Sequence, residues 1–467
     1  MSHAEHRTDH HEEHDLEHYL ERAHHGHGYE HDHRAPSREQ IEDLRQDAAK
    51  AYATLKGYFT LSDNYWQVGC SFDTLTDGLR ILGTAIDPGL AQDGLNKYRS
   101  TTGYWYDDFA WWSIAAAKAY DPAFTAVFGS LAGNFAGVAQ QTWTYLDKGL
   151  SDRVHLGAPQ VYENRDNDVY FTTPPEVPLY WATPRLDNGR GSGLHGVWQK
   201  DMFAIERKRP EWTGPTEFNP NPSQPGDAMH LGPYQLTVVN TLYLLNAARF
   251  EQARRTHPEA PNCAAQLADE FGFLKAWMGL NPATPIPPGD RLLNVTFGDG
   301  SAVVLERVST YALNNGAYPP VQNWDAQTSW AGDQGLLING LAAYVQLNPG
   351  DPVLSSLLNA LLLGYARHLV DKDGVLWPYY PTTTDNKLES WDASDYASGI
   401  GVFMRGVLQA ARIPGGPVES AVKHPEFQAF LTKAVAWATS APTYDLFSSL
   451  NVLATLLAGI ELLIPRD

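Results

Sequence analysis

The feature that most constrains this chain is a helical hydrophobic pattern that recurs from residue 36 almost to the C-terminus. Apolar residues return at spacings of three and four, which places them on one face of an α-helix. The first helix has a capping pattern at 37–40 and continues through Ile41, Leu44, Ala48, Ala51, Tyr52 and Leu55. Further helical patterns span 64–84, 107–120, 122–148, 231–256, 262–279, 327–347, 352–371, 394–412, 425–440 and 444–463. The sequence therefore predicts an all-α fold.

The turns between many of these segments are short. They carry Gly, Pro or Asp, as in Tyr120-Asp121-Pro122 and in residues 348–352. Short turns between helices make sequential helices antiparallel neighbours. We therefore expect helical hairpins to be the repeating unit of the fold.

Two long segments, 150–230 and 281–326, interrupt the helical pattern. Long loops in a compact domain are usually functional or disordered. Because both segments are rich in Trp, Tyr, Asp and Asn, we expect them to wall a cleft. Within the second, residues Arg291 to Leu305 alternate around Gly298-Asp299-Gly300, which predicts a β-hairpin as the one notable sheet.

Residues 1–35 form a biased tail that holds eleven of the seventeen histidines among many acids. Imidazole and carboxylate groups are ligands for divalent zinc, nickel or copper. The histidines have no fixed spacing, so a solvated, disordered segment is the other interpretation. We expect this tail to precede a single domain, 36–467, and we assign it no catalytic role.

Composition and charge exclude several classes of protein. The chain is 43% hydrophobic and 12% aromatic, enough for a large core in a globular protein. With 34 basic and 54 acidic residues its net charge is −20, which disfavours nucleic acid and anionic lipid as partners. The two cysteines, Cys70 and Cys263, support no disulfide framework.

The ends of the sequence lead to an expectation about location. No apolar stretch of roughly 7 to 15 residues follows Met1, so we expect a cytoplasmic protein. The apolar segment 451–465 is interrupted by Thr455 and Glu461 and is shorter than the roughly 20 residues of a membrane helix. We interpret it as a core helix and expect no membrane partner.

The most informative segment for chemistry is 104–112, in which Asp107 and Asp108 stand among aromatic residues at a helix start. Glycoside hydrolysis needs one carboxylic acid and one carboxylate, about 5 to 5.5 Å apart in retaining enzymes. Adjacent residues diverge by about 100° inside a helix, so the pair should lie where the chain enters it. Mutual repulsion would then separate their pKa values. The alternative role is helix capping.

A family resemblance covers most of residues 50–412. Trp105 to Trp111, followed by an apolar helix to Asp121, resembles the paired-aspartate motif of glycoside hydrolase family 76, the endo-α-1,6-mannanases and related enzymes. In the same order, the segments 196–198, 234–249, 330–335 and 399–405 are similar to other motifs of that family. Asp333 stands where the family usually has asparagine, and Gly399 where it usually has lysine.

This resemblance implies an (α/α)6 barrel that carries a retaining glycosidase. It implies Asp107 as the nucleophile and Asp108 as the general acid/base, acting on an α-linked sugar such as an α-mannoside or another oligosaccharide. No cofactor or catalytic metal is implied. Because of the two departures, and because no export signal is seen, the resemblance leaves the sugar itself open.

Aromatic and polar side chains suggest where a sugar would bind. Sugar rings stack on Trp and Tyr, and their hydroxyl groups need polar partners. For any single Trp the alternative is core packing. For Ser394 or Asp395 we expect helix capping, with substrate binding as the alternative. The predicted substrate-binding set is Trp66, Trp105, Tyr106, Trp111, Trp198, Asn240, Trp330, Asp333 and Gln334.

Two other functions stay open at this point. A sugar epimerase or isomerase on the same kind of barrel would use His195 or His230, and a non-catalytic protein would bind carbohydrate or handle metal. His368, within a helical segment, is expected on a solvated face. The sequence has no phosphate-binding loop, zinc-protease motif or nucleophile elbow.

Overall fold

The computed structural model describes residues 38–103, 105–147, 169–170, 197, 204–205, 236–280, 291–294, 297–306, 328–370, 377–381 and 395–463. The expected tail, and most of the two expected insertions, lie outside these residues. Among the predicted site residues, Trp198 also lies outside them, as do His195 and His230.

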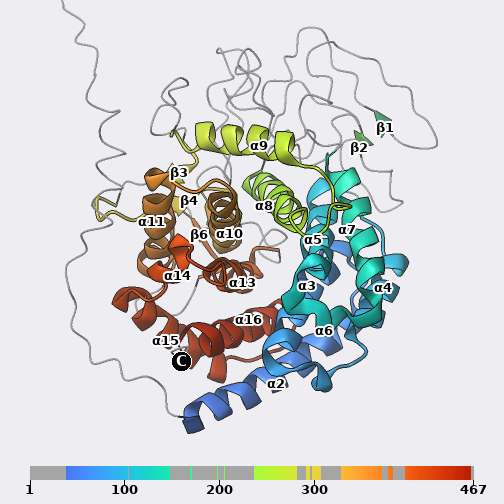
Figure 1. Ribbon diagram of the computed structural model, residues 1–467. Coiled ribbons are helices and arrows are strands. Elements are labelled where there is room, and N and C mark those ends of the chain that lie inside the picture. The colour runs from blue at the N-terminus through green and yellow to red at the C-terminus, as the bar shows by residue number, and fades with distance from the viewer. Residues whose placement is uncertain are drawn as a thin grey trace, which may run out of the picture.

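Six helices form a closed inner ring (Figure 1). Each contacts the next along the chain, and the last contacts the first. They are α3 (Tyr65–Leu82), α5 (Tyr106–Ala117), α8 (Thr237–Ala253), α10 (Ala331–Leu347), α13 (Gly399–Ala411) and α16 (Leu446–Leu462).

A second set of helices packs outside the ring. Between consecutive inner helices the chain passes through at least one outer helix, so inner and outer helices alternate. The outer helices are α2 (Arg38–Leu61), α4 (Leu90–Ser100), α7 (Ala132–Leu146), α9 (Ala264–Trp277), α11 (Pro352–His368), α14 (Pro417–Ala421) and α15 (Pro425–Ser440). This alternation is an (α/α)6 barrel, and the predicted all-α fold is confirmed.

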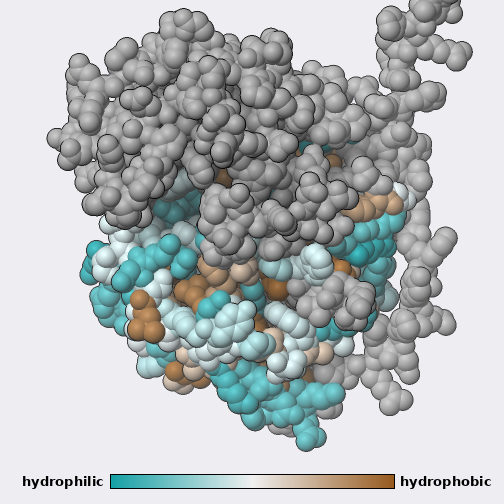
Figure 2. All heavy atoms as spheres, turned by 180° about the vertical axis from the view of Figure 1, so that it is seen from behind, coloured by the Kyte–Doolittle hydropathy of each residue, from teal (hydrophilic) through white to brown (hydrophobic). Residues whose placement is uncertain are grey.

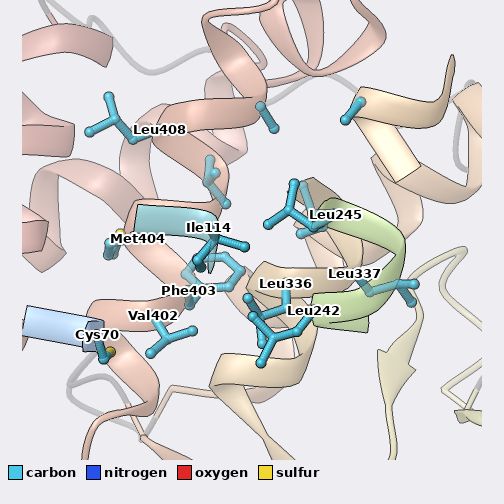
Figure 3. Close-up of a cluster of buried hydrophobic side chains, with 14 of the residues drawn as sticks. Cys70, Ile114, Leu242, Leu245, Leu336, Leu337, Val402, Phe403, Met404 and Leu408 are labelled. Carbon is cyan, nitrogen blue, oxygen red and sulfur yellow. The ribbon is translucent and has the colours of Figure 1, made fainter. Parts of the chain in front are cut away.

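The inner helices are apolar on nearly every side because they touch neighbours on both sides, an outer layer and the ring interior. Leu242 and Leu245 of α8, Leu336 of α10 and Phe403 of α13 meet in one buried cluster (Figure 3). Glycines let α10 and α13 approach closely. A Cβ atom at Gly335 would lie 2.4 Å from the Cα atom of Phe403. The late apolar segment forms α16, which is buried as predicted.

Two helical predictions need correction. The segment expected as one helix from 122 to 148 is divided into η3 (Pro122–Phe124), α6 (Thr125–Phe128), η4 (Gly129–Leu131) and α7. Gly129 adopts a positive φ of 50°, a conformation that breaks a helix. Helix α4 was not expected, because its polar residues obscure the few apolar ones.

The predicted β-hairpin is present. Strands β3 (Leu293–Asn294) and β4 (Val303–Val304) pair antiparallel, and both glycines of the turn have positive φ. It is not the only sheet. Antiparallel pairs also join β1 (Val169–Tyr170) to β2 (Ala204–Ile205), and β5 (Thr328–Trp330) to β6 (Tyr379–Pro381). The two strands of each of these pairs lie far apart in sequence, so no local sequence pattern predicts the pairing.

His368 is not on a solvated face, contrary to the prediction. Its Nε2 atom lies 2.8 Å from the Ser301 hydroxyl and 3.1 Å from a carboxylate oxygen of Asp299. Its ring stacks on Phe297 at 3.6 Å. The side chain therefore fastens the turn of the β3–β4 hairpin to the end of α11.

Among the described residues, Pro122–Leu146 is long and apolar enough to cross a membrane by length and composition. In the barrel this segment ends in α7, which packs against α5 and buries Trp143 and Leu146. Figure 2 shows the reverse side of the molecule, where hydrophobic residues in the described part are interrupted by hydrophilic ones. About a third of the apolar stretch is buried in the barrel.

Candidate active site

The two adjacent aspartates lie in the first turn of α5, where the chain enters the inner ring. Trp105 precedes the helix, and its backbone N–H donates to an Oδ atom of Asp108 at 3.0 Å. Asp108 is buried, whereas Asp107, taken as a whole residue, is partly exposed. The predicted position of the pair, at the entry to a helix, is the observed one.

The environment of Asp107 favours its protonated form. Its Oδ1 atom is shielded from solvent and accepts no hydrogen bond within the described part of the chain. Burial, and next the negative charge of Asp108, raise the pKa of Asp107 well above its usual range. Backbone N–H groups of the first turn offset only part of this effect. These surroundings favour the neutral form of one carboxyl group of the pair.

A third carboxylate, Asp395, belongs to the same electrostatic cluster. It lies just before α13, and its charge also contributes to the raised pKa of Asp107. Surrounding protein, and next the charge of Asp108, raise the pKa of Asp395 to about 6. Solvent reaches this side chain, so screening limits the effect of its charge. The sequence suggested capping for Asp395, yet it is the backbone carbonyl of Asp395 that accepts hydrogen bonds from the N–H and hydroxyl groups of Ser398.

Aromatic side chains connect the beginnings of three inner helices. Trp66 of α3 stacks on Phe447 of α16 at 5.7 Å and lies 6.3 Å from Trp111 of α5. These rings, together with the three carboxylates, place the candidate site at the end of the ring where the inner helices begin. Trp66, Trp105 and Tyr106 are partly exposed, so they are the described aromatic residues of the predicted set that fit a sugar-binding role.

Asn240 and Gln334 do not fit the substrate-binding role predicted for them. The Asn240 carboxamide accepts from the Val197 N–H at 2.8 Å and donates to the carbonyl of Leu236. Gln334 accepts from the Val304 N–H and donates to two carbonyl groups. Both side chains are fully buried. Their hydrogen-bonding groups hold backbone segments in place around the ring.

Trp111, Trp330 and Asp333 are also buried. Trp111 packs in the core, and the Trp330 indole N–H donates to the carbonyl of Tyr396 at 3.1 Å. These placements do not fit direct contact between either tryptophan and a sugar. Asp333 lies in the first turn of α10, where a negative charge is favourable.

The packing around Gly399 explains why this position holds a glycine. A Cβ atom there would lie 2.4 Å from the carbonyl oxygen of Pro378 and 2.6 Å from the indole nitrogen of Trp330. A larger side chain, such as the lysine usual in the resembling family, would need the chain around it to move. The close packing at this end of the ring therefore accounts for a glycine, rather than a lysine, at position 399.

Sequence reasoning missed Tyr65 and Gly103. The Tyr65 ring packs against the rings of Phe109, Trp112 and Tyr98. Burial raises the pKa of Tyr65, and the charge of Asp108 adds to the effect. A Cβ atom at Gly103 would lie 2.8 Å from the Tyr65 ring. The one signal in the sequence was their closeness to the paired aspartates and to Trp66.

A buried network of ion pairs and hydrogen bonds lies next to the aromatic residues of the candidate site. The Arg405 guanidinium lies 5.5 Å from the Trp111 ring and binds Asp73 at 2.8 Å. It also donates to the carbonyl oxygen of Cys70. Within the described parts of the chain, no three His, Cys, Asp or Glu side chains gather to hold a metal ion. Metal binding by the tail stays a prediction.

No family model matches the sequence, and a search of curated proteins finds no match. Solved structures do match. An inactive variant of the Salegentibacter α-1,6-mannanase GH76A, in complex with α-1,6-mannotriose, is 13% identical with a TM-score of 0.53. The match covers 90% of this chain and 100% of that one. In that variant two adjacent aspartates are replaced by asparagine.

Two other solved structures are similar over comparable lengths. Dfg5 from Chaetomium thermophilum, in complex with glucosamine, is 14% identical with a TM-score of 0.52, covering 92% of each chain. The Lin0763 protein from Listeria innocua is 12% identical with a TM-score of 0.51, covering 89% of this chain and 97% of its own. At these identities the likeness shows the fold. The chain has the (α/α)6 barrel of family 76 glycoside hydrolases, as the resemblance implied.

Proposed function

We propose that this protein is a retaining glycoside hydrolase that acts on an α-linked sugar through Asp107 and Asp108. The observation that carries the proposal is the position of this pair. It is the only place in the sequence where two aspartates are adjacent, and it opens an inner helix of the barrel beside a third carboxylate. The inactive Salegentibacter variant, altered at two adjacent aspartates, supports the same chemistry.

We infer that the free pair holds one proton. The raised pKa of Asp107 and the N–H donated to Asp108 favour Asp107 as the group that holds it. The roles implied by the resemblance are the reverse, with Asp107 as nucleophile. We therefore propose that the proton passes from Asp107 to Asp108 when the sugar binds. Asp107 is then the carboxylate, and Asp108 is the acid.

Catalysis follows as a double displacement. The Asp107 carboxylate attacks the anomeric carbon while Asp108 protonates the glycosidic oxygen, so the carbon–oxygen bond to the leaving sugar breaks. Asp108, now a carboxylate, takes a proton from water, and that water attacks the anomeric carbon of the glycosyl ester. The released sugar keeps its original configuration, Asp107 is again a carboxylate and Asp108 is again an acid, and the proton returns to Asp107 when the site is empty.

An α-1,6-linked mannooligosaccharide is the first substrate to test, because the Salegentibacter structure contains α-1,6-mannotriose. The glucosamine in the Dfg5 structure makes an amino sugar the second. The partly exposed rings of Trp66, Trp105 and Tyr106 support binding of a sugar face. The cytoplasmic location expected from the sequence stays a prediction.

The test is hydrolysis of a panel of α- and β-linked aryl glycosides and oligosaccharides. We expect the wild type to release sugar from an α-linked member, and Asp107→Asn and Asp108→Asn each to lose about a thousandfold or more in kcat/KM. Asp43→Asn, at an exposed aspartate of the outer helix α2, is the matched control. Full activity in either site variant, or no hydrolysis by a folded wild type, contradicts the proposal. In the second case, sugar binding without turnover would favour a non-catalytic carbohydrate-binding protein.

A further inference from the structure

The inner ring has a second end, where its helices finish, and a cavity of about 440 Å³ opens there. It is lined by the last turns of α5, α8, α10 and α13 together with the segment 118–124. We call it the C-terminal cavity. The proposed hydrolase makes no use of it, because the paired aspartates lie where the inner helices begin.

Basic side chains dominate the charge around the C-terminal cavity. Most of them are neutralised by direct ion pairs. The Lys118 Nζ atom lies 2.7 Å from Asp73 and 2.8 Å from Asp77. Arg412, on the cavity wall, reaches Asp77 at 3.5 Å. These contacts hold the pKa of Asp77 down to about 2, against the effect of burial.

Arg249 is the exception. It lines the cavity from α8, and no carboxylate of the described residues lies within 4 Å of its guanidinium group. Nη1 donates to the carbonyl of Ile114 at 2.8 Å, and Nη2 donates to the side-chain oxygen of Gln409. Two of its five N–H donors are thus used. A guanidinium group of this kind can still bind an anion that enters the cavity.

The groups around the cavity offset the positive charges of Arg249 and Arg412 only in part. The carbonyl ends of four helices favour cations at this end of the ring, and the Asp121 carboxylate lies on the same wall. Asp121 also accepts the Ala123 N–H at 2.9 Å. Even so, burial lowers the pKa of both Arg249 and Arg412. Each guanidinium is therefore less well stabilised than in water.

We propose that the C-terminal cavity binds a small oxyanion, namely a phosphate group, between Arg249 and Arg412. A guanidinium fork suits phosphate because it offers two parallel donors, and Arg249 is the basic group of this wall without a direct ion pair among the described residues. The volume leaves room for more than the phosphate itself. The ring of Phe124 forms an apolar wall beside Arg412, at 5.3 Å. Free inorganic phosphate and a small phosphate monoester share this chemistry.

The test is calorimetric titration of the full chain with inorganic phosphate, and separately with glycerol 3-phosphate, at ionic strength matched with chloride. We expect saturable binding at one site, and Arg249→Gln should weaken it about tenfold or more, as expected for the loss of a charged hydrogen-bonding partner. The tighter of the two ligands identifies the source of the phosphate.

A second variant separates binding from folding. Gln346 is exposed on the cavity wall, and its side-chain oxygen accepts from Gln252 at 2.6 Å. Gln346→Glu keeps that acceptor and adds a negative charge, so it should also weaken phosphate binding. Gln92→Glu makes the same change at an exposed position outside the cavity and should have no effect. No saturable binding by the wild type, or wild-type affinity in both cavity variants, would overturn the proposal.

Discussion

At the scale of single residues, the site combines groups that are unfavourable for stability. Asp107 is held where its charged form is poorly solvated and repelled by Asp108 and Asp395. Such an arrangement destabilises the folded protein at neutral pH, but it would supply the proton that the proposed reaction needs. Catalysis and stability therefore make opposite demands on this side chain.

Replacing Asp107 should stabilise the protein at neutral pH. Its folded-state pKa is raised, so between about pH 4, the unfolded value, and that pKa the folded state holds a proton that the unfolded state releases. Stability therefore falls as pH rises through this window. Asp107→Asn removes the fall, so its melting temperature should exceed that of the wild type at pH 7 and converge with it below about pH 4. A variant less stable than the wild type at pH 7 would contradict this account.

Asp395 should influence the pH dependence of the proposed reaction. Its negative charge contributes to the raised pKa of Asp107, so Asp395→Asn should lower that pKa. The alkaline limb of the kcat/KM profile, where the free pair loses its one proton, should move to lower pH. Measuring the profile from acidic to alkaline pH checks this. An unmoved or upward-shifted limb would show that Asp395 does not act on the pair.

At the scale of elements, buried ion pairs as well as apolar packing hold the inner helices together. Asp73 of α3 lies 2.7 Å from Lys118, just beyond α5, and 2.8 Å from Arg405 of α13. All three side chains are buried. The ion pairs therefore connect three neighbours of the ring.

Breaking this ion-pair network should lower the free energy of unfolding far more than breaking a surface ion pair. Asp73→Asn leaves two buried cations without a full counter-charge, and we expect a loss of about 3 to 5 kcal/mol in the free energy of unfolding. Asp47→Asn, which removes an exposed pair with Lys50, should change it by about 0.5 kcal/mol or less. Urea unfolding of both variants gives the comparison. Equal losses would show that the network is not structural.

Close helix contacts give a second prediction at this scale. Gly335→Ala would press a methyl group into the backbone of α13, and we expect it to lower the free energy of unfolding by about 1 to 3 kcal/mol. Gly57, exposed within α2, has no atom near an added Cβ. Gly57→Ala should therefore stabilise the protein by about 0.5 to 1 kcal/mol. If both changes have the same sign in thermal or urea unfolding, the close approach of α10 and α13 is wrong.

At the scale of the whole molecule, periodicity was enough to predict most helices and their hairpin order, because apolar faces record burial directly. It could not show the breaks in 122–146, where Gly129 takes a conformation that no apolar pattern signals. Nor could it show that β5 pairs with β6, because the partners are distant in sequence.

The site was predicted unevenly for a related reason. Asp107 and Asp108 were predicted from their adjacency and their place at a helix start. Asp395 is distant in sequence and joins them only through the closure of the ring. Asn240 and Gln334 have polar side chains of the kind that binds sugars, but their partners are buried backbone groups. A motif alone does not distinguish these two uses of an amide.

The central claim is that adjacent aspartates in this barrel act as a retaining pair. The most direct test is proton NMR of the first-formed sugar during hydrolysis of an α-linked substrate identified by the panel, before the anomers equilibrate. Double displacement through Asp107 predicts that the α-anomer is released first. Initial release of the β-anomer would contradict the claim, because it requires a single displacement by water.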